Sequence, residues 1–223
     1  MNTPRVVCFD LGGVLVRICR SWAEASVHAP LPCRNALAFA SEAMRSRRKD
    51  VVDRYQRGDL ESDAYYLELS RAVDELYSIT EVEQIHAAWT LTEYPGALPL
   101  VQELNRVPEV TTACLSNTNA VHWRRLAGED GRTEYPAVLA LRHRLASHLL
   151  RCSKPDASIY ERARATFFEP LVGRPEDIIF FDDLPENIAA ASAAGWTAFL
   201  VDPQADPPSQ MRAHLVSLGL LSR

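Results

Sequence analysis

Four short runs rich in Val, Ile, Leu and Phe constrain the fold of this 223-residue chain more than any other feature. They cover Arg5 to Phe9, Val110 to Leu115, Ile178 to Phe181 and Thr197 to Val201, with a weaker run near Leu145 to Ser147. Continuous apolar runs of this length are typical of strands buried on both faces. A helical pattern precedes each of the three later runs, at Leu98 to Arg106, Pro155 to Thr166 and Pro185 to Ala194. This alternation predicts an α/β fold, a parallel sheet with helices on both faces.

A long segment after the first run has a different pattern. Between Cys19 and Leu91 we find no convincing strand, and apolar residues recur at helical spacing, as in Tyr65, Leu69 and Val73. We therefore expect a core domain, residues 1–18 and 92–223, and a helical cap, residues 19–91, inserted after the first strand. An insertion at this point would cover the carboxyl ends of the strands, where open α/β sheets bind ligands.

Composition excludes several classes of partner. The formal net charge of -5 argues against binding to nucleic acid, which requires a strongly basic face. No apolar stretch approaches the roughly 20 residues that span a bilayer, and no basic and apolar leader precedes the first strand. The five cysteines are odd in number and widely spaced, so they indicate neither a disulfide framework nor a zinc site. We expect a cytoplasmic protein with a small-molecule partner and no membrane contact; the pattern is silent on oligomeric state.

Polar residues follow the predicted strands, and in a parallel sheet the carboxyl ends of the strands meet at one edge. The residues at these ends are Asp10, the segment Ser116-Asn117-Thr118-Asn119 and the pair Asp182-Asp183, while Lys154 precedes the helix at Pro155. Carboxylates that converge repel one another unless a cation lies between them, and ligation by oxygen alone favours Mg²⁺. Lys154 is also one of only two lysines among 24 basic residues, the other being Lys49. The pattern predicts a magnesium site beside a lysine.

Four motifs resemble, in order, those of the haloacid dehalogenase-like (HAD) hydrolases. They are Asp10-Leu11-Gly12-Gly13-Val14, Leu115-Ser116-Asn117, Ser153-Lys154-Pro155 and Phe181-Asp182-Asp183. The longer stretches around the last three resemble most the small sugar-phosphatase subgroup that includes α-D-glucose-1-phosphate phosphatase. The resemblance spans nearly the whole core and implies a Rossmann-like sheet and a phosphatase with a bound Mg²⁺.

The resemblance also implies roles for individual residues. Asp10 would attack phosphorus as the nucleophile and form an aspartyl-phosphate. Ser116 and Asn117 would bind the phosphoryl oxygens, and Lys154 would neutralise that group and keep Asp10 ionised.

The metal ligands follow from the same resemblance. They would be Asp10, the main-chain carbonyl of Gly12, Asp183 directly and Asp182 through water. Asn187 lies one turn after Asp183, where it either orients a ligand or is structural.

Gly12 departs from the family pattern, because most phosphatases of the family have a second aspartate there. Glycine keeps the carbonyl and lacks the general acid–base group, whose loss lowers rates on the order of 10²–10⁴. A Mg-dependent phosphomonoester hydrolase acting on a small phosphorylated metabolite, such as a sugar phosphate, is the leading interpretation. The alternatives are a 2-haloacid dehalogenase, in which the same aspartate attacks carbon without a metal, and a catalytically impaired domain that binds phosphate or a partner.

Two groups of residues in the expected cap have open roles. Arg45, Arg47, Arg48 and Lys49 form a basic cluster that either contacts an anionic substrate or is a solvated helix face. Trp22, Tyr55 and Trp89 either stack on a sugar ring or belong to the core of the cap.

Overall fold

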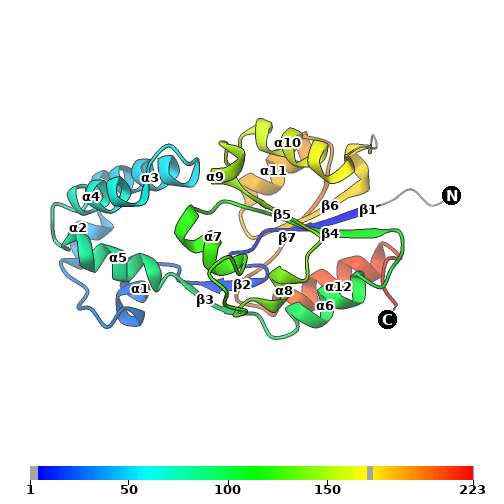
Figure 1. Cartoon of the computed structure of the whole chain (residues 1–223), viewed down its shortest axis with the longest axis horizontal. Helices are drawn as coiled ribbons and strands as arrows, with labels where there is room; N and C mark the ends of the chain where they lie inside the picture. The colour runs from blue at the N-terminus through cyan, green and yellow to red at the C-terminus, as the bar shows by residue number, and fades with distance from the viewer. Residues whose placement is uncertain (1–4, 170–172, 223) are drawn as a thin grey trace.

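The computed structural model describes residues 5–169 and 173–222, and its centre is a five-stranded parallel sheet (Figure 1). The strand order is β5-β4-β1-β6-β7, and every neighbouring pair runs parallel. The strands are β1 (Arg5–Phe9), β4 (Val110–Ser116), β5 (His143–Ala146), β6 (Ile178–Asp182) and β7 (Thr197–Leu200). The prediction of an α/β fold with helices on both faces of a parallel sheet is confirmed.

Two layers of helices cover the sheet (Figure 1). One layer contains α6 (Ala97–Leu104), α8 (Pro136–Leu139) and α12 (Pro207–Ser217); the other contains α9 (Ser147–Leu150), α10 (Ala157–Phe168) and α11 (Pro185–Ala193), with the 3-10 turn η1 (Pro175–Asp177) before β6. Strand β1 shows why both faces are apolar. Val7 and Phe9 pack in the cluster that includes α6 and α12, whereas Val6 and Cys8 pack in the cluster that includes α10 and α11. Because successive side chains point to opposite faces, a continuous apolar run is buried only between two layers.

A group of five helices lies at the carboxyl end of the sheet and has its own apolar core (Figure 1). The helices are α1 (Trp22–His28), α2 (Ala36–Ala40), α3 (Glu42–Gln56), α4 (Ser62–Ala72) and α5 (Ile79–Ala87). We call this group the cap, and its outer boundaries at residues 19 and 91 stay a prediction. No helix in the described part of the chain has the length and apolar character needed to cross a membrane.

A two-stranded ribbon connects the sheet to the cap. Strands β2 (Val16–Ile18) and β3 (Thr90–Glu93) pair in an antiparallel manner, with a register shift between Val16 and Ile18. The expectation of no strand between Cys19 and Leu91 is therefore wrong at its end, because β3 begins at Thr90. Each strand is only three or four residues long and neither is a continuous apolar run, so the pattern gives no local signal for them.

The cap contacts the core through a buried hydroxyl. Ser147 Oγ donates to the carbonyl of Gln56 at the end of α3 (2.6 Å) and accepts from the backbone N–H of Thr118 (2.9 Å). Ser147 is fully buried, so water cannot replace these partners. The hydroxyl ties the carboxyl end of α3 to the loop that follows β4.

Replacing Ser147 with Ala should lower the free energy of unfolding by roughly 1–3 kcal/mol, because two buried backbone groups lose a hydrogen-bond partner. Chemical denaturation measures this change. The matched control is Ser217→Ala, since the Ser217 hydroxyl is exposed and bonds only within α12. Equal stabilities of the two variants would show that the buried contact contributes nothing.

Candidate active site

The residues predicted from the strand ends meet at the carboxyl edge of the sheet. Asp10 follows β1, Ser116 ends β4 and Asp182 ends β6, and β1 lies between the other two strands. One carboxylate oxygen from each of Asp10, Asp182 and Asp183 lies within 4.8 Å of the others. Lys154 reaches the same place from the loop before α10.

The ammonium of Lys154 lies between two carboxylates. Its Nζ is 3.0 Å from Asp10 Oδ1 and 2.6 Å from Asp182 Oδ2, and the side chains of Lys154 and Asp182 are 1% and 0% exposed. Burial alone would lower the pKa of Lys154, but the attraction of Asp10 and Asp182 raises it overall, so the lysine is charged. Burial raises the pKa of Asp10 to about 7; Lys154 opposes the rise, and the charges of Asp182 and Asp183 add to it. The ammonium therefore offsets part of the repulsion among the acids.

Protein donors occupy both oxygens of Asp182. Oδ1 accepts from the backbone N–H of Leu184 (2.9 Å) and from Asn187 Nδ2 (2.9 Å), and Oδ2 accepts from Lys154 and also lies 3.1 Å from Asn187 Nδ2. Asn187 is held in turn, because Tyr160 donates its hydroxyl to the Asn187 carbonyl (3.0 Å). Asp182 thus orients the lysine, and Asn187 orients Asp182.

The amide of Asn117 holds the backbone of Lys154. Its Nδ2 donates to the Lys154 carbonyl (2.8 Å), and its Oδ1 accepts from the Lys154 N–H (2.9 Å). One Nδ2 hydrogen is left for a ligand. Ser116 is buried at the end of β4, and both residues line a cavity that is described below.

Asp183 forms an ion pair that the sequence did not indicate. Arg20 Nη1 lies 2.6 Å from Asp183 Oδ2, and the Asp183 side chain is 5% exposed. Burial raises the pKa of Asp183, although Arg20 opposes the rise. Gly13, at a φ of +82°, permits this arrangement, because a Cβ atom there would lie 2.7 Å from Asp183 Oδ2. Arg20 follows the unpredicted strand β2, and no local pattern indicates its partner.

The apolar side chain of Ile18 borders Gly12, the position at which the general acid–base aspartate is absent. A Cβ atom built on Gly12 would lie 3.0 Å from Ile18 Cδ1, so any side chain at this position would press on Ile18. Gly12 and Ile18 both line the cavity.

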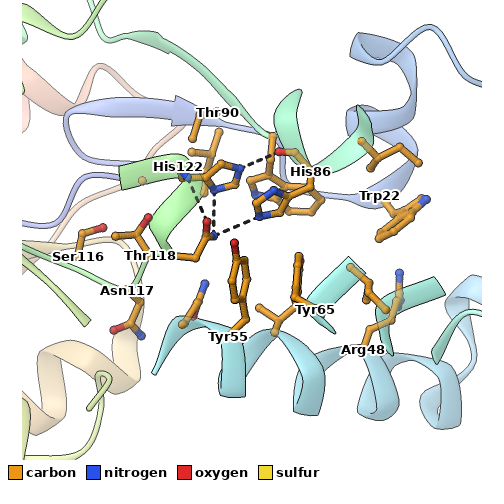
Figure 2. Close-up of a pocket in the computed structure, with 18 of the residues that line it drawn as sticks. Trp22, Arg48, Tyr55, Tyr65, His86, Thr90, Ser116, Asn117, Thr118 and His122 are labelled. Carbon is orange, nitrogen blue, oxygen red and sulfur yellow. Dashed lines mark hydrogen bonds between the residues drawn. The ribbon is translucent and has the colours of Figure 1, made fainter. Parts of the chain in front are cut away.

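A cavity of about 420 Å³ separates the cap from the carboxyl edge of the sheet. Ser116 and Asn117 lie at one end and Trp22 and Arg48 at the other, with Tyr55 between them (Figure 2). Trp22, Tyr55 and Trp89 all line this space, as do three members of the expected basic cluster, Arg45, Arg48 and Lys49. Arg47 instead pairs with Asp74 (2.8 Å). The basic cluster is therefore divided between the cavity and the outer surface of the cap.

Two stacked histidines form part of the wall (Figure 2). The rings of His86 (α5) and His122 (α7, Ala120–Leu126) lie 3.9 Å apart at an angle of 9°. Because a carbonyl only accepts, His122 Nε2 donates to the His86 carbonyl (2.7 Å), and the other ring nitrogen of His122 lies 3.3 Å from Asn119 Nδ2. Asn119 Nδ2 also lies 3.2 Å from His86 Nε2. This pattern requires both rings to be neutral, and the histidine spacing in the sequence gave no sign of the pair.

A second set of potential metal ligands lies near the start of the cap. Ligand atoms of Cys19, Glu24 and His28 lie within 4.8 Å of one another. Burial raises the pKa of Cys19 to about 11, with Glu24 adding to the rise, and the thiol points to the Ala88 carbonyl (3.6 Å). The Glu24 carboxylate also accepts from the backbone N–H of Arg20 (2.6 Å), so two of the three groups already have protein partners.

The fold and the cluster of acids define an enzyme whose reactive groups meet at the carboxyl edge of a parallel sheet, under a helical insertion. The family model for haloacid dehalogenase-like hydrolases matches residues 4–195, so the chain belongs to this family and is a hydrolase. The superfamily resemblance is thereby confirmed, while the sugar-phosphatase subgroup stays a prediction.

Solved structures share the fold. A HAD family enzyme from Bacteroides thetaiotaomicron is 16% identical, with a TM-score of 0.71 over 95% of this chain and 100% of its own. A predicted HAD-like family hydrolase from Porphyromonas gingivalis is 22% identical, with a TM-score of 0.71 over 96% and 98%. L-2-haloacid dehalogenase from Xanthobacter autotrophicus is 19% identical, with a TM-score of 0.61 over 98% and 84%. One of these three neighbours is a haloacid dehalogenase, so the shared fold is compatible with the dehalogenase alternative.

The buried histidines should make stability depend on pH. Burial lowers the pKa of His122 to about 4 and that of His86 well below its ordinary value. The unfolded imidazoles titrate near 6.5, so the stability that depends on neutral rings is complete above about pH 6.5 and falls as the pH drops toward 4. Between pH 6 and pH 5 the wild type should lose about 1 kcal/mol more than His122→Gln, which removes one such ring.

Denaturation curves at several pH values measure this difference. The control His28→Gln changes an exposed histidine and should keep the wild-type slope. Parallel pH profiles for the wild type and His122→Gln would contradict a buried neutral ring at His122.

Proposed function

We propose that this hydrolase is a magnesium-dependent phosphomonoester hydrolase that acts on a small phosphorylated metabolite, with sugar phosphates as one candidate class. The observation that carries the proposal is the approach of Asp10, Asp182 and Asp183 to within 4.8 Å. The three carboxylates face two protein cations, the buried ammonium of Lys154 and the partly exposed guanidinium of Arg20, so an excess of negative charge remains that a divalent cation would neutralise. A dehalogenase that attacks carbon without a metal has no need of this group.

The donor set fits Mg²⁺. Every candidate ligand is an oxygen, and the buried Oδ1 of Asp10 has no well-oriented hydrogen bond apart from its ion pair with Lys154. Asp10, Asp183 and the Gly12 carbonyl would hold the ion. A contact of Asp182 with the ion through water stays a prediction, because both of its carboxylate oxygens already accept hydrogen bonds from the protein. When bound, Mg²⁺ supplies positive charge to the phosphoryl oxygens. A structure of the Bacteroides enzyme in complex with magnesium and inorganic phosphate, 17% identical with a TM-score of 0.68, supports the proposal by fold.

The chain's own residues would perform hydrolysis in two displacements. A carboxylate oxygen of Asp10 attacks phosphorus, the bond from phosphorus to the ester oxygen breaks, and an aspartyl-phosphate forms on Asp10. Water then attacks that phosphorus, releases inorganic phosphate and restores Asp10. In both steps Lys154 and the amide of Asn117 hold the charged oxygens, whose charge spreads in the transition state.

The absence of an acid at Gly12 limits the substrates that suit this site. The departing ester oxygen takes its proton from solvent, so a substrate with an acidic leaving oxygen, such as an anomeric hydroxyl, loses least. The second displacement also lacks a general base. We therefore expect hydrolysis of the aspartyl-phosphate to limit turnover of such substrates.

Asp10→Asn should abolish phosphate release from an aryl phosphate, because the amide is not a nucleophile, and EDTA should stop the wild-type enzyme until Mg²⁺ is restored. The assay measures phosphate and, in parallel, halide from 2-chloropropionate. Halide release that persists in EDTA would identify a dehalogenase. Equal background rates in the wild type and Asp10→Asn would identify a non-catalytic binding domain.

Restoring the acid provides a second test. Gly12→Asp should raise kcat/KM, which reports the first displacement, by about 10²-fold or more for alkyl phosphates, whose leaving oxygens need a proton, and should raise it less for an activated aryl phosphate. The control Gly12→Ala adds the same contact with Ile18 and no acid. Equal gains in the two variants would attribute the effect to packing, and no gain in Gly12→Asp would contradict a missing acid.

A further inference from the structure

The two ends of the cavity are lined by different residues, and only one end contains residues that the proposed hydrolysis uses. Ser116 and Asn117 lie at the end above the sheet, whereas Trp22 and Arg48 lie at the opposite end in the cap (Figure 2). Apolar and aromatic side chains, among them Val52, Leu69 and Tyr65, also line the cavity. A substrate that fills the cavity therefore extends from Ser116 and Asn117, beside the carboxyl edge of the sheet, along apolar walls to the cap end.

Three cations of α3 line the cap end, and two of them have carboxylate partners. Arg45 lies 3.3 Å from Glu42, and Lys49 lies 2.5 Å from Asp53. Within residues 5–169 and 173–222, no carboxylate lies within ion-pairing distance of Arg48. Helix geometry gives the reason, because the residues three and four positions from Arg48 are Met44, Arg45, Val51 and Val52.

The guanidinium of Arg48 is nevertheless held in place. Its Nη2 donates to the Phe39 carbonyl (2.9 Å), and its Nε lies 3.4 Å from the Met44 carbonyl. Its Cζ lies 4.7 Å from the centre of the Phe39 ring and 5.9 Å from that of Trp22. These contacts orient the planar fork and leave Nη1 without a protein acceptor among the described residues.

The charge at this end of the cavity has no carboxylate partner among the described residues. Arg48 is half-buried, and burial together with the charge of Arg45 lowers its pKa. A half-buried, oriented cation that lines a cavity without a counter-ion favours an anionic oxygen group as its ligand.

We propose that Arg48 is a specificity-determining residue that binds a second anionic group of the substrate, a carboxylate or a second phosphate. The substrate class is then a phosphomonoester whose apolar or aromatic body separates the phosphate from this second oxyanion. The cavity of about 420 Å³ is within the usual range for sites that bind small molecules. The inference rests on the proposed function, because it assigns the other end of the cavity to the phosphoryl group.

The test compares matched aryl phosphates. Each has a para chain of one to four methylenes that ends in a carboxylate, a phosphonate or a neutral carboxamide, so that the leaving oxygen is electronically the same throughout. The wild type should prefer one of the anionic series over the carboxamide by about tenfold or more in kcat/KM, since a hydrogen bond between two charged groups is stronger than one to a neutral amide. Whether the carboxylate or the phosphonate series shows this preference identifies the second group.

Arg48→Gln should remove the preference, so that kcat/KM for the anionic compounds falls to about the value for the carboxamide in the same variant. Arg48→Lys, which keeps the charge and loses the planar fork, should retain part of the preference. The matched control is Arg47→Gln on the same helix, whose side chain faces Asp74 outside the cavity lining and which should retain the full preference. Thermal unfolding of each variant verifies that the cap is intact.

The outcomes separate the two proposals. No phosphate release from any compound, the carboxamide included, would overturn the phosphatase function itself. Phosphate release without a wild-type preference for either anion would overturn the role of Arg48 and leave the phosphatase standing. A wild-type preference that survives in Arg48→Gln would also overturn it and assign the second anion to another cation.

Discussion

The buried ammonium of Lys154 is the interaction on which the rest of the site depends. A lysine in an apolar interior is tolerated only where carboxylates offset its desolvation, and Asp10 and Asp182 do so at 3.0 and 2.6 Å. Asn117 holds the backbone of the same residue through two hydrogen bonds. Lys154 thereby connects four segments of the chain: the ends of β1 and β6, the loop after β4 and the loop before α10. The catalytic end is consequently organised before a ligand binds.

Much of this arrangement was predictable because it follows from local patterns. Asp10, Ser116 and Asp182 each follow or end an apolar run, and parallel topology alone brings such positions together. Lys154 is different, because it comes from a loop; its place before the helix at Pro155 and the resemblance of its motif together indicated that it lies beside the acids. The pairing of Asn187 with Asp182 was left open, since a residue one turn into a helix has several polar neighbours within reach.

The parts that escaped prediction depend on how the cap meets the core. Arg20, His86 and His122 come from segments far apart in the chain, and their partners exist only once α5 and the β2–β3 ribbon are in place. Arg48 had a signal of its own, since no acid lies three or four residues from it. That signal was uninformative without the knowledge that this face of α3 borders a cavity and not solvent.

Gly12 and Arg48 line the same cavity. Ile18 borders position 12, where a general acid would lie, and it also lines the cavity. The side chain that limits the space at position 12 therefore also forms part of the apolar cavity wall. A catalytic end without an acid selects a substrate only by the acidity of its leaving oxygen, which many phosphate esters share. Discrimination among them must therefore come from contacts remote from phosphorus, which also provide binding energy for orientation. On α3, Arg48 is the cavity-lining cation that no described carboxylate neutralises, so under the proposed function the cap rather than the sheet would decide which phosphate ester the enzyme accepts.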